Sequence, residues 1–567
     1  MITHWVSFGK RLGDTMPMMT FAQPSLLDPL AISPQALEPG TLGHLLRDLG
    51  DDIVPGFLRA EWRGVGSRGR PAWPVSKLLG LQLLRWVTGG MSRVAACERA
   101  KTDLAWRAAL RLPSSGPTPS EKTLREFEKW LMQRTDTCDQ LRYEVLFEGL
   151  TLRASGVVSE ATWVMDGTPM YCFGALQGTV RMLGDGLRGL LRRWRRLRGG
   201  TLAQVARRLG VPWVVAKSIK GGLAADWSDP KSRRDALNRL VQDVVRVVAH
   251  IEGQVHEVSP VQREFLRCRC RDLLRVVESD IEVDAEGNYL VRRKVGGDRQ
   301  VSITEPDARS GHKSKQSKFK GFKLVLLGDL FSGLITAVKV FPGNQAEGRH
   351  GIELLERAKR LQLSIVRALG DSAYGGTPTR LAALQLGIQL VAPPPAIQDR
   401  ADAPLQKHQF AVDFETQSAT CPAEISTTHH RMAPFEGKLR SVYEWPADVC
   451  GACPLRAACV PTMRDDTKPR GQRPKGRRLK LDVNEEALRR ARAEWASLRE
   501  EYRRRSQGER LVARMVRRGG RQARAFGLAA ANLQAHLIAM ANNLALLAVH
   551  LRGRAPEQPT LPLWGAM

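Results

Sequence analysis

The segment from residue 319 to residue 343, FKGFKLVLLGDLFSGLITAVKVFPG, constrains the fold most strongly. Two runs rich in β-branched and aromatic residues flank the turn-forming stretch DLFSG, which predicts an antiparallel hairpin. A helical stretch at 352–362, the apolar run SIVRALGD, the helical stretch PTRLAALQLG and the apolar run IQLV follow, and prolines end the last run. Together with a strand-like run at 160–173, this order predicts an α/β core built on a mixed sheet.

Two acids follow apolar runs that we expect to be strands. Asp166 comes after TWVM and Asp371 comes after IVRAL, and each precedes an expected glycine-containing turn. Ligand sites in open α/β sheets lie beyond the carboxyl ends of the strands. Two carboxylates brought together there repel unless a cation lies between them, and Mg²⁺ prefers carboxylates together with substrate phosphates. An Asp at a strand end is also commonly a turn or cap residue, as we expect for Asp329 in the hairpin turn.

The net charge indicates what such an acidic pair would act on. The 567-residue chain has 87 Lys and Arg against 58 Asp and Glu, which gives a formal charge of +29. That charge attracts polyanions and favours nucleic acid over an anionic membrane surface as the partner. We expect no membrane-spanning segment and no signal peptide. The apolar helix near the C-terminus contains Gln534, His536 and Asn542, so we expect it to lie in the protein core. A cytoplasmic location follows by default.

The length and the changes in composition predict several domains. The many Arg and Lys of the helical region after residue 65 favour DNA binding over protein interaction. The predicted regions are an N-terminal extension at 1–65, a helical DNA-binding domain at 66–150, the first part of the α/β core at 151–395 with a basic helical insert at 175–280, a Cys-rich and partly flexible insert at 396–482 that includes the polar, basic run RDDTKPRGQRPKGRRLKLD, the C-terminal helices of the core at 483–552, and a flexible tail at 553–567.

Basic segments supply candidate DNA contacts. The run LRGLLRRWRRLRGG places six arginines around Trp194, either as a phosphate-contacting surface or as a solvated helix face. The following TLAQVARRLGVPWVVAKSI has the pattern of a helix-turn-helix with Gly210 in the turn, or of an ordinary helix pair. Lysines near the hairpin either line a DNA path or protect a strand edge. The candidates are Arg192, Arg193, Arg195, Arg196, Lys313, Lys315, Lys318, Lys320 and Lys323.

The cysteines divide into scattered residues and one cluster. Nine cysteines in a long chain without an expected secretion signal argue against a disulfide framework. Four of them have the spacing C-x28-C-x2-C-x5-C, namely Cys421, Cys450, Cys453 and Cys459. This pattern favours structural zinc, with an iron–sulfur cluster or free thiols as alternatives.

Several ordered motifs together resemble those of bacterial insertion-sequence DDE transposases, which have an RNase H-like catalytic core. MDGTP and LGDSAYGG are similar to the first and second Asp motifs of that family. Tyr502-x2-Arg505-x3-Glu509 is similar to the YREK signature of one large branch, and the final Lys of the signature falls on Val516, beside Arg517. The segments RGRPAWPVSKLLGLQLLRWVTGGMS and GGRQARAFGL resemble the two ends of such enzymes, so the resemblance spans roughly residues 65 to 550.

The resemblance implies a catalytic set of Asp166, Asp371 and Glu509 that holds two Mg²⁺ or Mn²⁺ ions. Water attack would free a 3′-hydroxyl at the element's end, and that hydroxyl would then attack target DNA. The resemblance also implies a homodimer on double-stranded DNA, with Tyr502, Arg505 and either Arg514 or Arg517 near the phosphates. Two alternative functions remain open: a non-catalytic DNA-binding protein derived from such an enzyme, and a related metal-dependent nuclease. The tail sequence QPTLPLW resembles motifs that dock on the bacterial sliding clamp, or is simply disordered.

Overall fold

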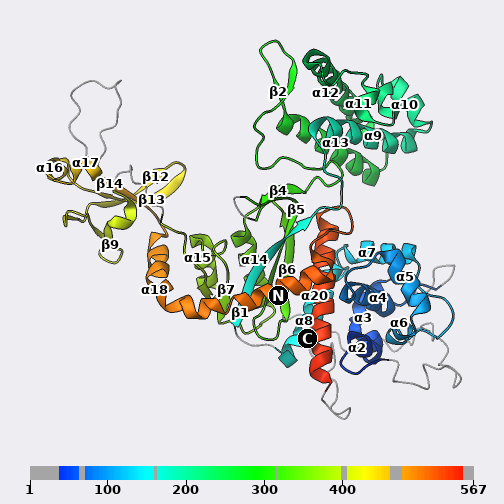
Figure 1. Cartoon of the computed structure of the whole chain (residues 1–567), viewed down its shortest axis with the longest axis horizontal. Coiled ribbons are helices and arrows are strands. Elements are labelled where there is room, and N and C mark those ends of the chain that lie inside the picture. The colour runs from blue at the N-terminus through cyan, green and yellow to red at the C-terminus, as the bar shows by residue number, and fades with distance from the viewer. Residues whose placement is uncertain are drawn as a thin grey trace.

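A six-stranded mixed sheet lies at the centre of the computed structural model, which describes residues 37–62, 71–158, 162–313, 316–397, 405–459 and 476–552 (Figure 1). The strand β5 is antiparallel to β1, β4 and β6, whereas β7 is parallel to both β1 and β8. This mixed sheet, flanked by helices, confirms the predicted fold class and the predicted hairpin. The strands are β1 (Thr162–Tyr171), β4 (Arg309–His312), β5 (Lys318–Asp329), β6 (Ile335–Pro342), β7 (Arg367–Leu369) and β8 (Gln389–Val391).

Successive side chains of the central strands enter two different cores, because side chains alternate between the faces of a sheet. Trp163 and Met165 of β1 pack in a cluster with α14 (Glu347–Arg360) and α15 (Thr377–Gln385). Val164 enters a larger cluster that contains α19 (Ser506–Met515) and α20 (Leu528–Leu551) and continues into the N-terminal helices. The sheet thus has helices on both faces, and the even-numbered side chains of β1 face α19.

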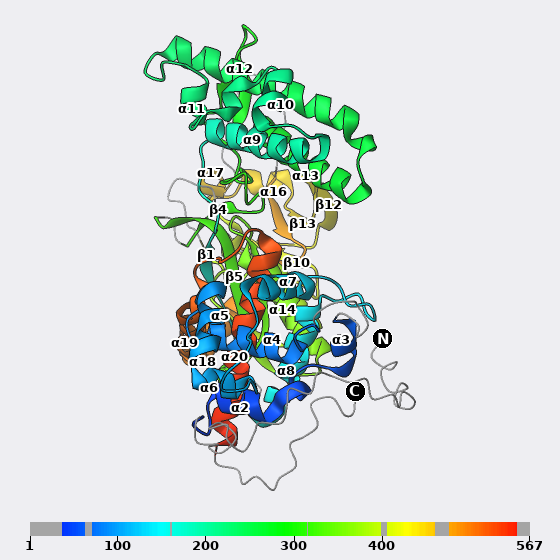
Figure 2. The ribbon, with the colours of Figure 1, turned by 90° about the vertical axis from the view of Figure 1, so that its right-hand side faces the viewer.

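The helix α20 holds the N-terminal helices against the sheet, with contacts to α4 (Val75–Val87), α8 (Arg142–Val158) and β6 (Figure 2). Among the described helices, α20 alone is long and apolar enough to cross a membrane, whereas the sequence predicted no such segment. However, 78% of its most apolar 18-residue stretch is buried inside the protein. Its polar groups bond to backbone: the Gln534 amide donates to Gly519 O and Gln522 O, and Asn542 donates to Gly333 O. The predicted core position is therefore confirmed.

The N-terminal helices form a compact group beside α20 (Figure 2). Ser92 caps α5 by accepting from the N–H of Ala95 (3.1 Å), and Ser120 caps α7 by accepting from that of Thr123 (3.2 Å). The helices are α2 (Leu42–Leu49), α3 (Gly56–Glu61), α4 (Val75–Val87), α5 (Arg93–Thr102), α6 (Leu104–Ala109), α7 (Glu121–Leu131) and α8 (Arg142–Val158).

A helical insert with its own hydrophobic core separates β1 from β4 and projects from one end of the sheet (Figure 1). The predicted helix-turn-helix in it is wrong, because α10 is followed by a single 3-10 turn at Pro212–Val215. Trp213 of that turn is buried and donates its indole N–H to Asp243 Oδ2 at 2.8 Å, so the segment serves the core of the insert. The helices are α9 (Thr179–Arg198), α10 (Leu202–Arg208), α11 (Ile219–Gly222), α12 (Pro230–Gln254) and α13 (Pro260–Asp280), with a hairpin of β2 (Ile281–Val283) and β3 (Tyr289–Val291).

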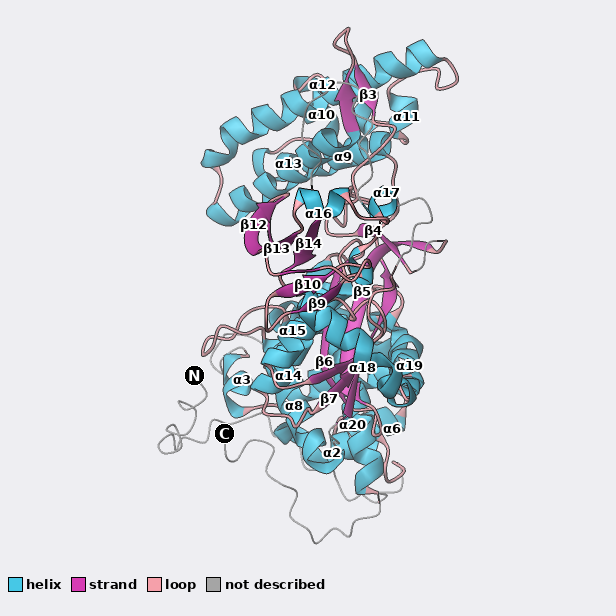
Figure 3. Ribbon diagram, turned by 90° about the vertical axis from the view of Figure 1, so that its left-hand side faces the viewer, coloured by secondary structure: helices cyan, strands magenta, loops and turns pink. Residues whose placement is uncertain are grey.

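A second insert projects in another direction (Figure 1) and contains two small sheets (Figure 3). The polar run RDDTKPRGQRPKGRRLKLD was predicted to be flexible. This is wrong for its last five residues, because Arg478–Asp482 forms the strand β14, in which Leu479 and Leu481 are buried. The other strands are β9 (Ala411–Asp413), β10 (Ser418–Thr420), β11 (Ser426–Thr427), β12 (His430–Phe435) and β13 (Lys438–Glu444), with helices α16 (Ala447–Gly451) and α17 (Arg456–Cys459). The helices α18 (Glu485–Arg503) and α19 (Ser506–Met515) return to the sheet.

Candidate active site

The register of two parallel strands brings Asp166 and Asp371 to one level of the sheet. The last pair between β1 and β7 is Val164 with Leu369, and each Asp lies two residues further on. The expectation that Asp166 ends a strand is wrong, because β1 continues to Tyr171 by pairing with β5. Between Val164 and Tyr171, however, β1 pairs with no described strand on its β7 side, which also explains why it tolerates Pro169, and at Tyr171 this side bonds to the backbone of Arg521 and Ala523. Both acids therefore lie at the carboxyl end of the parallel pair.

A close approach of α19 to β1 positions Glu509. A Cβ atom on the buried Gly508 would lie 2.5 Å from Cγ2 of Val164, a distance that real Cβ contacts do not show, so only glycine fits there without a shift. Leu511 and Met515 of the same helix enter the core. Because Val164 and Asp166 point to the same side of β1, the residue after Gly508 lies over the face that carries Asp166.

One cavity of about 590 Å³ collects the three predicted acids. Arg505 lies between two of them: its Nη1 is 3.5 Å from Asp166 Oδ2 and its Nη2 is 3.5 Å from Glu509 Oε1. Asp371 Oδ1 accepts the N–H of Ala373 at 2.9 Å, so this acid also closes the turn after β7. Within the described ranges, no group of three or more His, Cys, Asp or Glu side chains is arranged to hold a metal ion.

Burial and neighbouring acids perturb Asp166. Burial is the largest influence and raises the pKa of its carboxyl to about 6, and the charges of Asp371 and Glu347 act in the same direction. The Gly167 N–H, 2.8 Å from Oδ1, and the Arg505 guanidinium oppose this increase. A cation placed among these carboxylates would relieve their repulsion.

Glu347 is a fourth acid of the cavity that the sequence did not reveal. It begins α14, and its Oε1 pairs with Lys323 Nζ at 3.1 Å. A Cβ on Gly167 would lie 2.8 Å from Glu347 Oε2, so the glycine after Asp166 makes room for this carboxylate. A Glu in the first turn of a helix is commonly explained by its favourable interaction with the helix dipole, so its position in the sequence did not indicate a role in the cavity.

The predicted basic residues separate into several environments. Lys313, Lys323, Arg505 and Arg517 line the cavity, together with Arg521 and His312, which the sequence did not indicate. The remaining candidates lie elsewhere. Lys318 and Lys320 are exposed on β5, and Lys315 lies outside the described residues. Tyr502 packs against Trp495 with ring centroids 5.0 Å apart, and Arg514 packs against Gly333 of the hairpin turn. The arginines of α9 lie in the helical insert, where Arg192, Arg193 and Arg196 line another cavity and Arg195 lies on the same helix.

The four clustered cysteines line one small cavity with Trp445 and Arg477. The N–H of Arg477 points to Cys450 Sγ at 3.4 Å. Burial raises the pKa of Cys459, and the other three cysteines contribute to the increase, so the four sulfurs are near neighbours. All nine cysteines are free, as the argument against a disulfide framework predicted.

Two family models match the chain. Residues 283–544 match the family described as Transposase DDE domain, a range that includes Asp371 and Glu509, and residues 36–130 match the family described as Transposase domain (DUF772). Asp166 lies upstream of the first range, on the far side of the helical insert. Comparison with curated proteins and with solved structures gives no match. Both matched families are transposase families, and the sheet and the helical N-terminal region agree with them: the chain carries a Transposase DDE domain and a Transposase domain (DUF772).

Proposed function

We propose that this transposase cuts DNA at the ends of its element and joins the freed ends to target DNA at the cavity lined by Asp166, Asp371 and Glu509. The observation that carries the proposal is the meeting of these three acids, from three distant segments, in one cavity. Lysine and arginine side chains line the same cavity, which suits a substrate made of phosphodiesters.

We propose that these acids bind a pair of Mg²⁺ or Mn²⁺ ions. Because no described group of three such side chains is arranged to hold a metal ion, the carboxylates would have to move together as the ions bind. Such ions prefer carboxylate oxygens combined with substrate phosphates, and the Arg505 guanidinium already serves as a cation between two of the acids. When bound by Asp166, Asp371 and Glu509, two ions would activate the attacking oxygen and stabilise the leaving oxygen of an in-line displacement.

The basic side chains of the cavity would hold the DNA backbone during two displacements. In the first, a water oxygen bonds to phosphorus and the bond to the 3′ oxygen breaks, which leaves a 3′-hydroxyl on the element. In the second, that hydroxyl bonds to a phosphorus of target DNA and the bond to another oxygen breaks. Lys313 and Arg517 reach the cavity without an ion-pair partner among the described residues, so they are our first candidates for phosphate contacts.

The partners and location follow from this chemistry. We propose double-stranded DNA as the substrate, a homodimer to hold two element ends, and the bacterial cytoplasm, at the nucleoid, as the location. The tail motif QPTLPLW, which we propose binds the sliding clamp, lies outside the described residues. So does the segment FAQPSLLDPL at residues 21–30, which resembles the same motif more weakly. Deletion of residues 557–567 should abolish retention by the clamp in a pull-down, and unchanged retention would end that idea.

The test of the function is incubation of the purified protein with Mg²⁺ and DNA that carries the flanking ends of its own gene. Excised and joined products are expected from the wild type, and Asp371→Asn should retain DNA binding but lose at least about 10³-fold in rate. Glu500→Gln, an exposed acid on the neighbouring α18, serves as the matched control and should react normally. Cleavage without joining would support the nuclease, and binding without cleavage the non-catalytic protein.

We also propose that Cys421, Cys450, Cys453 and Cys459 bind one structural Zn²⁺. Their shared cavity and the Arg477 N–H directed at a sulfur support this. Because no described group of three such side chains is arranged to hold a metal ion, the thiols would have to close around the ion as it binds. Metal analysis should find one zinc per chain, lost in Cys450→Ser/Cys453→Ser and kept in Cys268→Ser, which removes an exposed thiol of α13. Iron with sulfide, or no metal, would refute zinc.

A further inference from the structure

The turn that follows β7 buries a tyrosine next to the acidic cavity. Asp371 begins this turn and lines the cavity, whereas Ser372 and Ala373 are exposed and Tyr374 is fully buried. The N–H of Tyr374 donates to Asp371 O at 3.1 Å and closes the turn. A movement of Asp371 would therefore carry Tyr374 with it.

Two glycines make room for the ring of Tyr374. A Cβ on Gly351 of α14 would lie 2.6 Å from Cδ1 and 2.7 Å from Cε1 of the ring, and a Cβ on Gly370, the residue after β7, would lie 3.0 Å from its Cδ2. The same Cβ position on Gly351 is 3.3 Å from Sδ of Met165, the residue before Asp166. Packing between α14, β1 and the end of β7 therefore fixes the position of the ring.

The hydroxyl of Tyr374 has no hydrogen-bond partner among the described residues, although the side chain is fully buried. An unpaired buried hydroxyl costs free energy, and a phenylalanine ring would fill the same space without that cost. The hydroxyl thus points to a partner that reaches it in another state of the protein.

Glu347 is the acid best placed to be that partner. Burial raises the pKa of the Tyr374 hydroxyl well above its usual value, and among the neighbouring charges that of Glu347 has the largest effect in the same direction. Glu347 lies one helical turn before Gly351, on the face of α14 that the ring covers. Its Oε1 pairs with Lys323 at 3.1 Å, whereas its Oε2 makes no hydrogen bond or ion pair within the described ranges. A free donor and a free acceptor therefore lie at the same part of α14.

The turn after β7 is in direct contact with the start of α14. A Cβ on Gly348 would lie 2.9 Å from Ala373 O. Because the proposed ligands would have to move together as the ions bind, Asp371 would draw this turn along the first turn of α14. Such a shift can bring the Tyr374 hydroxyl and the Glu347 carboxylate within hydrogen-bond distance.

We propose that Tyr374 is a positioning residue of the acidic cavity. In the ion-bound state its hydroxyl donates a hydrogen bond to Glu347 and holds this carboxylate beside Gly167, apart from the three acids that bind the ions. The proposal rests on the proposed function in that the ions and the cleavage of DNA belong to it. Tyr374 contacts neither the DNA nor the ions, and it acts only through Glu347.

The first test is single-turnover cleavage at saturating Mg²⁺. Tyr374→Phe keeps the ring and removes only the hydroxyl, so we expect cleavage to slow about fivefold with unchanged DNA affinity. Because the hydroxyl acts through Glu347, the double variant Tyr374→Phe/Glu347→Gln should be no slower than Glu347→Gln alone. Tyr443→Phe removes the hydroxyl of a buried tyrosine of β13, in the second insert, and should cleave normally as the control.

Two outcomes of this experiment would overturn the proposal. One is cleavage by Tyr374→Phe at the wild-type rate. The other is a double variant whose loss of rate is the product of the two single losses, because the hydroxyl would then act without Glu347.

A second measurement does not depend on cleavage. The chain has six tyrosines, so nuclear magnetic resonance of the full chain labelled with ¹³C at the tyrosine Cζ gives few signals, and the one absent from Tyr374→Phe belongs to Tyr374. Adding Mg²⁺ to the protein bound to a short element-end duplex should shift this signal in the wild type but not in Glu347→Gln. A signal that stays in place in the wild type, or that shifts equally in both proteins, would overturn the proposal. The expected shifts without DNA cleavage would count against the proposed function alone.

Discussion

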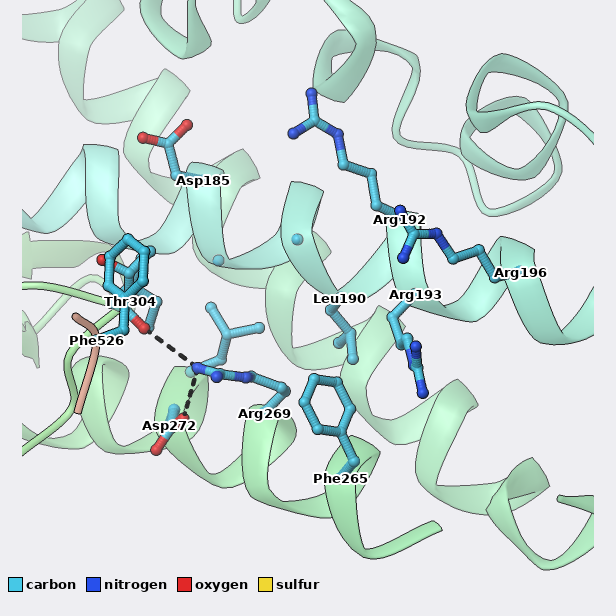
Figure 4. A pocket seen from close by; sticks show the side chains of 14 residues that line it. Asp185, Leu190, Arg192, Arg193, Arg196, Phe265, Arg269, Asp272, Thr304 and Phe526 are labelled. Carbon is cyan, nitrogen blue, oxygen red and sulfur yellow. Dashed lines mark hydrogen bonds and ion pairs between the residues drawn. The ribbon is translucent and has the colours of Figure 1, made fainter. Parts of the chain in front are cut away.

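The two cavities of this transposase differ in how their charges are balanced. In the acidic cavity, Arg505 lies between Asp166 and Glu509, and Lys323 pairs with Glu347, so protein cations stand against buried acids. In the cavity of the helical insert, which Arg192, Arg196 and Phe265 line, the two arginines are exposed and have no such partners among the described residues (Figure 4). The first arrangement can exchange an internal cation for metal ions, whereas the second presents unpaired positive charge to the solvent. This difference supports our proposal that the chemistry takes place at the sheet.

The largest effect that would test this assignment comes from Gly508, which lets α19 touch β1. Gly508→Ala should displace α19, because its Cβ would meet Val164 at 2.5 Å, and a shift of about 1 Å can cost about 10²-fold in rate. DNA affinity should remain. The measurement is single-turnover cleavage, with Gly253→Ala as the control because its Cβ meets nothing within 4 Å. Normal cleavage by Gly508→Ala would break the link between helix position and chemistry.

A smaller effect should come from the fourth acid of the acidic cavity. Glu347→Gln keeps the shape of the side chain but removes a negative charge from beside Lys323 and Asp166. We expect about tenfold slower cleavage with unchanged DNA affinity, because the residue balances charge at the site without being one of the three proposed ligands. Glu356→Gln, in the same helix, is the control. Faster cleavage, or a loss as large as that of Asp371→Asn, would show that the role of Glu347 has been misjudged.

The smallest effect distinguishes two arginines that the sequence left as alternatives. Arg517 lines the acidic cavity, whereas Arg514 packs under the hairpin turn, where burial lowers its pKa. Arg517→Ala should weaken DNA binding and reduce the slope of log affinity against log salt by about 1. Arg514→Ala should leave that slope unchanged and lower the free energy of unfolding by about 1–3 kcal/mol through lost packing. A salt effect from Arg514 alone would reverse the assignment.

The sequence predicted those parts of the fold that local pattern encodes. The hairpin of β5 and β6 follows from two β-rich runs around a turn, and Asp329 accepts the N–H groups of Phe331 and Ser332 as a turn acid should. The common cavity of Asp166, Asp371 and Glu509 agrees with the ordered motifs, although their catalytic role stays a prediction.

The errors arose where tertiary contacts decide the outcome. The residues Gly167 and Pro169 predicted a turn after Asp166, but pairing with β5 extends the strand through them. Pro212 and Trp213 read as the start of a second helix, yet burial of Trp213 selects a 3-10 turn. Glu347 could not be found because only the fold brings the start of α14 beside Gly167.

The most direct test of the central claim is a titration with Mn²⁺, followed by electron paramagnetic resonance, on the protein bound to a short element-end duplex. The account predicts two bound ions per chain in the wild type and in Glu500→Gln. It predicts the loss of at least one ion in each of Asp166→Asn, Asp371→Asn and Glu509→Gln. Two undiminished ions in any of these three variants would contradict it, because that acid would then not belong to a shared metal site.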